Sequence, residues 1–263
     1  MPELLLDQLT LHYETEGKGP PLVLIPGMLS DSASWFPLVD PLSEHFTLIR
    51  PDPRGAGRSR PLDAEITLDT LAEDILALAT NLGHDRFAVA GHSLGGLVAA
   101  RLSAIAPERL SGLVIIASTP KPSGRLPHLF QTLCDIRAKA GGERLWLMSL
   151  FPWLFHDGFF RDPAAVEAAV QANLDYPHMQ TLEAMRHQTK ALGRLNLRSL
   201  PGRFETPALV LLAEDDAMIA APSAKATWEA RGAQARIIAD AGHSLHWDQP
   251  AMAVEAIVDF LSA

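Results

Sequence analysis

Continuous apolar runs alternate along the chain with segments whose apolar residues recur at helical spacing. Residues 22–25, 87–90 and 113–117 are uninterrupted apolar runs, which is the pattern of strands buried on both faces of a sheet. Residues 68–82 carry apolar side chains every three or four positions, and Gly83 ends this helical pattern. Such strand-helix units predict a mostly parallel α/β sheet covered by helices on both faces.

The remaining segments extend this alternation to both ends of the chain. Residues 3–14 hold two short alternating stretches around Asp7 and Gln8, which predict an antiparallel hairpin at a sheet edge. Further strands are expected at residues 46–50, 207–213 and 235–239, and helices at residues 223–231 and 251–261.

The alternation stops after residue 117 and does not resume until residue 207. The segment between them is rich in aromatic residues and helix formers, and we expect Pro152 and Gly158 to break it into pieces. We therefore predict that residues 1–117 and 207–263 form the α/β core. Residues 118–206 are then a helical cap insertion over the carboxyl ends of the strands.

Ser93 stands at an abrupt junction between an apolar run and a helical pattern. Gly91 and Gly95 flank it, so strand and helix can approach closely while the hydroxyl points outward. This arrangement predicts a nucleophile elbow. The helix begins directly after the serine, which places the amide of Leu94 at a positive helix end, where it can donate to an oxyanion.

A serine nucleophile needs a base and an acid that orients this base. His243 follows the strand expected at residues 235–239, and Asp216 lies in the turn after the strand expected at residues 207–213. Its neighbour Asp215 is the alternative acid. The chain order serine, acid, histidine is that of enzymes that use a nucleophile elbow.

These motifs together make the chain resemble the alpha/beta-hydrolase superfamily, as a small capped serine hydrolase similar to esterases and enol-lactonases. The motifs are the elbow of residues 91–96, the loop of residues 52–59, the acidic turn of residues 214–216 and the pair Gly242-His243. The resemblance implies an eight-stranded sheet and a second oxyanion donor, the amide of Met28. Pro26 and Ala217 depart from residues that many members carry.

The aromatic residues of the predicted cap exceed what a short helical segment can bury within itself, so we expect part of them to face a pocket above Ser93. The loop of residues 28–35 is expected to complete this pocket. The substrate-pocket residues predicted from the sequence are Leu29, Trp35, Trp146, Phe151, Trp153 and Phe155. His92 and His246 are expected to be structural or to line the pocket, and Asp52 and Arg54 to brace loops.

Composition argues against large polyanionic partners, and the partner that we expect is a small-molecule substrate. The net charge of −9 and the scattered basic residues argue against nucleic acid or an acidic membrane surface. The single cysteine, Cys134, allows no intrachain disulfide, and no cluster has metal-ligand spacing, so neither a metal nor a cofactor is expected. The acidic start fits no signal peptide, and we expect a cytoplasmic protein that is a monomer or a dimer.

Three functions remain open at this stage. The first is a serine hydrolase that cleaves a small ester, lactone or related acyl bond through an acyl-enzyme. The second is hydrolysis of a carbon–carbon bond in ring-cleavage products, for which Arg137, Arg144 or Arg186 would have to bind a carboxylate. The third is a ligand-binding receptor that retains the fold.

Overall fold

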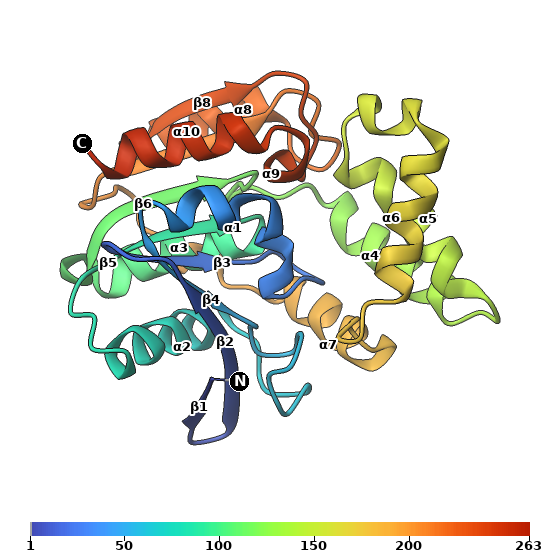
Figure 1. The fold of residues 1–263 in the computed structure, drawn as a ribbon, viewed down its shortest axis with the longest axis horizontal. Coiled ribbons are helices and arrows are strands. Elements are labelled where there is room, and N and C mark those ends of the chain that lie inside the picture. Colours follow the sequence, from blue (N-terminus) through green and yellow to red (C-terminus); the bar gives the residue numbers. More distant parts are fainter. Residues whose placement is uncertain (1) are drawn as a thin grey trace.

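The computed structural model describes residues 2–263, and its centre is one eight-stranded sheet in the order β1-β2-β4-β3-β5-β6-β7-β8 (Figure 1). The first two strands form an antiparallel edge hairpin, β2 pairs antiparallel with β4, and every other pairing is parallel. The α/β fold class predicted from the sequence is therefore confirmed. The strands are β1 (Glu3–Leu6), β2 (Leu9–Glu16), β3 (Pro21–Ile25), β4 (Thr47–Pro51), β5 (Phe87–His92), β6 (Leu110–Ile116), β7 (Ala208–Ala213) and β8 (Gln234–Ile238).

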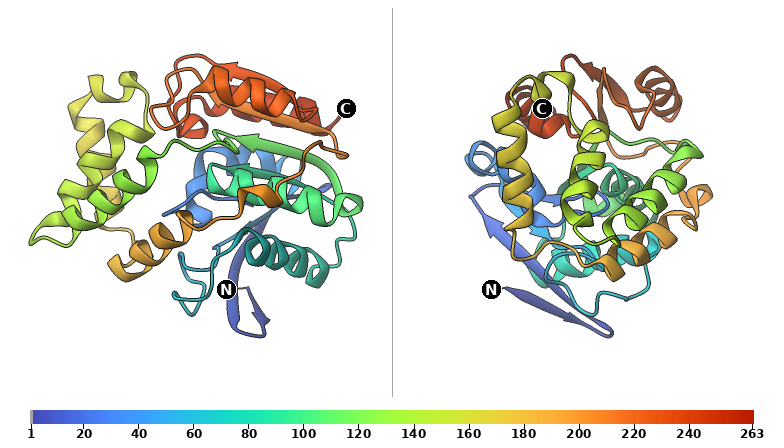
Figure 2. Two further views of the ribbon diagram at one scale, coloured as in Figure 1. Left: turned by 180° about the vertical axis from the view of Figure 1, so that it is seen from behind. Right: turned by 90° about the vertical axis from the view of Figure 1, so that its right-hand side faces the viewer.

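Helices cover both faces of this sheet, as Figures 1 and 2 show. Residues of α2 (Leu68–Asn81), α3 (Leu94–Ile105) and α8 (Ala221–Glu229) belong to the hydrophobic cluster on one face. Those of α1 (Phe36–Ser43), α9 (Leu245–Asp248) and α10 (Pro250–Leu261) belong to the cluster on the other. Short 3-10 helices lie at Ser32–Trp35, Pro107–Arg109, Asp157–Arg161 and Leu197–Ser199.

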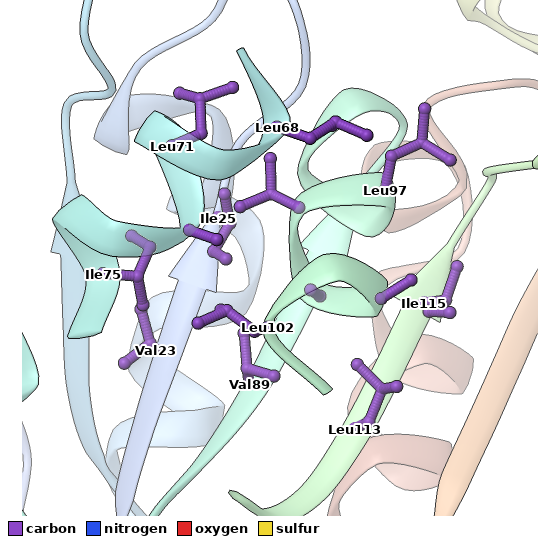
Figure 3. Close-up of a cluster of buried hydrophobic side chains, with 14 of the residues drawn as sticks. Val23, Ile25, Leu68, Leu71, Ile75, Val89, Leu97, Leu102, Leu113 and Ile115 are labelled. Atoms are coloured by element: carbon purple, nitrogen blue, oxygen red, sulfur yellow. The ribbon is translucent and has the colours of Figure 1, made fainter. Parts of the chain in front are cut away.

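The alternation of side chains along β3 explains why its sequence is apolar at every position. Val23 and Ile25 pack against α2 and α3 (Figure 3), whereas Leu22 and Leu24 belong to the cluster on the opposite face. All four side chains are buried. Successive side chains of a strand point to opposite faces, so a strand covered by helices on both sides needs apolar residues throughout.

Four longer helices occupy the segment between β6 and β7. They are α4 (Arg125–Arg137), α5 (Gly142–Leu154), α6 (Pro163–Leu174) and α7 (Leu182–Leu192). The chain leaves the carboxyl end of β6, and these helices gather beyond that end of the sheet (Figures 1 and 2). Phe130 and Met185 from this segment belong to the same hydrophobic cluster as Val23 of the sheet, so treating residues 118–206 as a separate unit stays a prediction.

The expected break at Pro152 is wrong, because this proline lies inside α5, which continues to Leu154. Proline lacks an amide hydrogen and cannot donate to the carbonyl four residues earlier, but Pro152 lies only two residues before the end of α5, so little of the helix lies beyond the missing bond. Gly158 does lie outside the α-helices, in the 3-10 helix that follows α5.

Within residues 2–263 no helix combines the length and apolar character needed to cross a membrane.

Candidate active site

Ser93 occupies the sharp turn between β5 and α3 and has a strained backbone, with φ 52° and ψ −114°. A left-handed conformation is unfavourable for a residue with a side chain and is kept where the surrounding structure enforces it. Here the Ser93 amide donates to the carbonyl of Ile116 at 2.8 Å. A Cβ on Gly91 would collide with the Gly95 carbonyl, and one on Gly95 would collide with the Ile25 carbonyl. Glycines at these two positions therefore permit the turn.

His243 joins Ser93 to Asp216 through its two ring nitrogens. Nε2 of His243 lies 3.0 Å from Oγ of Ser93, and Nδ1 lies 2.8 Å from Oδ2 of Asp216. The histidine and aspartate side chains are almost completely buried, at 4% and 1% exposure. In this geometry Nδ1 donates its proton to the carboxylate and Nε2 accepts from the serine hydroxyl, which is the proton arrangement of a base poised on a nucleophile.

The turn after β7 distinguishes the two neighbouring aspartates. Oδ1 of Asp216 accepts from the amides of Met218 and Ile219 at 2.8 and 2.9 Å, so the carboxylate is held in one orientation. Asp215 points elsewhere: its side chain is 56% exposed and lies 3.3 Å from Nε2 of His156. The structure thus brings Asp216, and not Asp215, onto the imidazole.

Two further histidines are buried beside this array. The ring of His92 lies with its centroid 5.1 Å from that of His243 and 4.6 Å from that of His246. Nε2 of His92 donates to the His243 carbonyl at 2.9 Å, which fixes the backbone of the histidine loop. Burial lowers the pKa of His92 well below its ordinary value, and burial together with the nearby His243 lowers the pKa of His246 to about 3. Both rings are therefore neutral at pH 7.

The loop of residues 52–59 braces the backbone next to the site. The buried carboxylate of Asp52 accepts from the side chain and amide of Arg58, each at 2.8 Å, and from the Ser32 amide at 3.0 Å. Burial opposes this charge, but the bonds to Arg58 and the Ser32 amide hold the pKa of Asp52 below its usual value. Arg54 pairs with Asp74 on α2. Both Asp52 and Arg54 thus hold loops in place.

A cavity of about 480 Å³ lies between the ends of the strands and the helices α4 to α6, with Ser93 and His243 in its wall. Most of the lining is apolar. Its hydrophobic side chains include Met28, Leu29, Phe130, Trp146, Leu147, Leu150, Phe151, Leu154, Phe155, Phe159 and Met218. Such a site can enclose the apolar part of a small molecule next to the serine hydroxyl.

Four of the six predicted pocket residues line this cavity: Leu29, Trp146, Phe151 and Phe155. The prediction is wrong for Trp35, which is fully buried in the cluster beneath α1, with its ring against His246. It is also wrong for Trp153, which does not line the cavity and packs, partly buried, against the hydrophobic cluster. Both tryptophans lie on α5, where residues seven apart share a face, so their spacing in the sequence could not show that only Trp146 reaches the cavity.

The two predicted oxyanion donors lie beside Ser93. Leu94 is the first residue of α3, so its amide has no acceptor within the helix. Met28 follows Gly27, and a Cβ added to Gly27 would lie 3.3 Å from Cβ of Ser93, which places the backbone of this loop next to the serine. The Met28 side chain lines the cavity.

Sequence reasoning missed several polar residues that line the cavity, among them Asp248, Tyr176 and Gln180. Oδ2 of Asp248 accepts from the amides of Gly242 and His156, at 2.8 and 3.0 Å, and so ties the histidine loop to the segment after α5. Burial raises the pKa of the Asp248 carboxyl. Its position five residues after His243 was the only available signal, whereas Tyr176 and Gln180 lie in a linker without a recognisable motif.

The single cysteine lies in a buried position, and the described residues form no metal-binding cluster. Cys134 is buried on α4 with its Sγ 3.6 Å from the hydroxyl of Thr189. In the described part of the chain no group of three or more His, Cys, Asp or Glu side chains is arranged to hold a metal ion.

Comparison with known proteins places this fold among hydrolases. Over 217 residues, 80% of each chain, the sequence is 25% identical to RutD of Agrobacterium fabrum, to which a carbamate hydrolase activity is ascribed. It is 42% identical over 111 residues, 42% of each chain, to the pimeloyl-[acyl-carrier protein] methyl ester esterase of Nitrosomonas europaea.

Solved structures agree on the architecture. The enol-lactonase from Burkholderia xenovorans LB400 superposes with a TM-score of 0.85 at 24% identity, and the match covers all of both chains. The sequence profile described as alpha/beta hydrolase fold matches residues 20–250. With the sheet order, the strained serine turn and the Ser93–His243–Asp216 array, this match shows that the chain belongs to the alpha/beta hydrolase fold family.

Proposed function

We propose that the protein is a serine hydrolase that cleaves a small ester, lactone or related acyl bond. The observation that carries this proposal is the hydrogen-bonded Ser93–His243–Asp216 array in the wall of a largely apolar cavity. The relatives named for ester, lactone and carbamate hydrolysis support the same reaction class.

The proposed reaction begins with attack of Oγ of Ser93 on the substrate carbonyl carbon while Nε2 of His243 takes the hydroxyl proton. The developing oxyanion lies at the amides of Leu94 and Met28, and one donor of this kind typically contributes about 3 kcal/mol to transition-state stabilisation. His243 then gives its proton to the leaving oxygen or nitrogen, which leaves an acyl-enzyme.

Water completes the cycle. His243 takes a proton from the water as its oxygen attacks the acyl carbon, and returns that proton to Oγ of Ser93 as the acid departs. The Asp216 side chain stabilises the imidazolium in both steps. Its bonds to the Met218 and Ile219 amides prevent the carboxylate from turning away from the ring.

The carbon–carbon hydrolase alternative lacks the anchor it needs. Arg186 is exposed and does not line the cavity, and Arg144 is exposed and paired with Glu167. Arg137 is buried behind the cavity wall, with its guanidinium 4.5 Å from the ring centre of Trp146. Among residues 2–263 no lysine or arginine lines the cavity, so nothing there favours the carboxylate of a ring-cleavage product.

A panel of p-nitrophenyl esters and lactones, assayed with wild type and Ser93→Ala, tests the proposal. We expect wild type to hydrolyse short and medium esters, and Ser93→Ala to lose about 10⁶-fold in kcat with an unchanged Tm. Ser149→Ala, on the exposed face of α5, is the matched control. A fluorophosphonate should add covalently to Ser93 in a mass spectrum.

Activity of Ser93→Ala near the wild-type level on every accepted ester would refute the nucleophile assignment. Lack of turnover and of fluorophosphonate labelling in wild type would instead favour the receptor hypothesis.

A further inference from the structure

One end of the cavity is polar, and the acyl-transfer steps make no use of its polar groups. Asp31 follows the oxyanion loop, Tyr176 and Gln180 lie in the linker between α6 and α7, and all three line the cavity. We call these three residues the acceptor cluster. Because the other lining residues are mostly apolar, these groups define which part of a ligand can be placed at this end.

The carboxylate of Asp31 is buried without an ion-pair partner. Asp31 is only 6% exposed. Its Oδ1 accepts from the Ala33 amide at 3.0 Å, and its Oδ2 accepts from the Tyr176 hydroxyl at 2.8 Å. A carboxylate can accept about four hydrogen bonds, so capacity remains. The nearby Arg58 gives its donors to Asp52, Glu14 and Ser32, and no cation within residues 2–263 forms an ion pair with Asp31.

Gln180 adds an acceptor that has no partner within residues 2–263. The residue is 8% exposed, and its Nε2 donates to the Gly55 carbonyl at 2.7 Å. Its Oε1 is buried and has no hydrogen-bond partner among the described residues. A buried carbonyl oxygen without a donor is costly, so the cavity-lining side chain of Gln180 holds an acceptor that gains from a donor carried by a ligand or by water.

The members of the cluster lie close together around one loop. A Cβ added to Gly57 would lie 2.8 Å from Cβ of Asp31, and Gln180 is bonded to Gly55, two residues earlier. Gln188 also donates to the Gly55 carbonyl, at 3.2 Å, so the amide of Gln180 is not the only bond that holds this loop. Asp31 and Gln180 are therefore both held against the loop of residues 55–57.

We propose that the acceptor cluster is a subsite for a protonated amine carried by the substrate, which places the positive charge at Asp31 and an N–H bond on Oε1 of Gln180. The proposal deepens the proposed function and rests on it, because it names the substrate class of the same cavity. The absence of lysine and arginine from the described lining agrees with it, since a carboxylate-bearing ligand would meet Asp31 and find no cation.

Direct binding to Ser93→Ala tests the subsite independently of turnover. The probes are octylamine, octanol and octanoate, which have the same alkyl chain and differ in the charge of the head group. Their binding is measured by titration calorimetry at pH 7. We expect octylamine to bind at least tenfold more tightly than octanoate, with octanol between them. In Ser93→Ala/Asp31→Asn the ratio of the two dissociation constants should fall at least tenfold.

Two further variants separate recognition from folding. Gln180→Met is close to isosteric and keeps the Gln188 bond to the loop, and we expect it to weaken octylamine severalfold and leave octanoate unchanged. Asp157→Asn, on the exposed surface of the cap, is the matched charge control and should leave the ratio unchanged.

Equal binding of octylamine and octanoate, or an amine preference that survives both Asp31→Asn and Gln180→Met, would overturn the subsite. That result differs from failure of the proposed function, which would appear as absence of ester turnover by wild type with the binding preference still present.

Discussion

The distinction between two adjacent aspartates carries much of the chemistry proposed for this protein. Asp216 bonds both to His243 and to two backbone amides, whereas Asp215 faces solvent near His156. An acid that holds the imidazole must be buried and fixed, because an exposed carboxylate would share its hydrogen bonds with water. One position along a turn thus decides which carboxylate can orient the base.

We therefore expect Asp216→Asn to lower kcat by about 10⁴-fold, since the amide would favour the wrong imidazole tautomer. Asp215→Asn is the matched control and should retain nearly wild-type kcat. Steady-state kinetics on one p-nitrophenyl ester, with circular dichroism to verify folding, measures both. Equal losses in the two variants would show that the assignment of the acid is mistaken.

At the scale of elements, the helical segment between β6 and β7 supplies most of the apolar wall above Ser93. Phe151, Phe155 and Phe159 contact one another, with ring centroids 4.6 to 6.0 Å apart, and all three line the cavity. Phe160 contacts Phe159 edge-on but does not line the cavity. The same aromatic cluster thus contains residues that shape the cavity and one that only supports it.

Phe155→Ala should shift the preferred acyl chain toward greater length, because the removed ring leaves apolar space in the cavity. Each additional buried methylene is worth about 0.8 kcal/mol, or roughly fourfold in kcat/KM. Phe160→Ala is the matched control, with the same change outside the cavity. A chain-length profile of p-nitrophenyl esters measures the shift, and identical profiles for the two variants would mean that this wall does not select the acyl chain.

Asp248 connects two elements, since one carboxylate oxygen accepts from Gly242 beside the proposed base and from His156 after α5. The Ser244 amide also donates to the Leu154 carbonyl, at 2.7 Å. The position of the histidine loop is therefore coupled to the end of α5.

In Asp248→Ala both amides lose their acceptor, which we expect to cost about 1–3 kcal/mol in the free energy of unfolding. A displaced His243 should also lower kcat by up to about 100-fold with little change in KM. Asp248→Asn keeps one acceptor oxygen and should restore most of the activity. Asp259→Ala, on the exposed side of α10, is the control. A lower Tm of Asp248→Ala without loss of kcat would contradict the positioning role.

At the scale of the whole molecule, buried neutral histidines link stability to pH. The pKa of His246 is lowered from 6.5 to about 3 in the folded state, chiefly by burial. Below pH 6.5 the unfolded chain binds a proton that the folded chain does not. This contribution to stability is complete above pH 6.5 and is lost progressively as the pH falls from 6.5 toward 3.

Urea unfolding at pH 6.5 and 5.0 should show this loss as about 2 kcal/mol from His246, since one group contributes about 1.4 kcal/mol per pH unit in this range. His92 and His12 act in the same direction, whereas burial of Asp31, Asp74 and Asp248 raises their pKa values and acts oppositely at lower pH. Between pH 6.5 and 5.0, the free energy of unfolding of His246→Gln should fall by about 2 kcal/mol less than that of wild type. His45→Gln, at an exposed position, should keep the wild-type slope, and an unchanged slope in His246→Gln would contradict the prediction.

The sequence by itself determined the fold class and the three side chains of the array. Residues 22–25 are apolar throughout because both sheet faces are covered, and Gly91 and Gly95 stand where a Cβ would collide with backbone. The apolar run and the glycine spacing around Ser93 are local sequence patterns, so they can be recognised along the chain even though the Cβ on Gly95 would meet Ile25, which is distant in the sequence.

Only the tertiary structure decided which residues face the cavity. Trp35 and Trp146 have the same side chain, yet one is buried beneath α1 and the other lines the cavity. Asp31 meets Tyr176 across a separation of 145 residues, and Asp248 meets His156 across 92. Contacts of this kind depend on the packing of elements distant in the chain, and their residues carry no local pattern, so the polar end of the cavity became visible only when the helices between β6 and β7 were placed over the sheet.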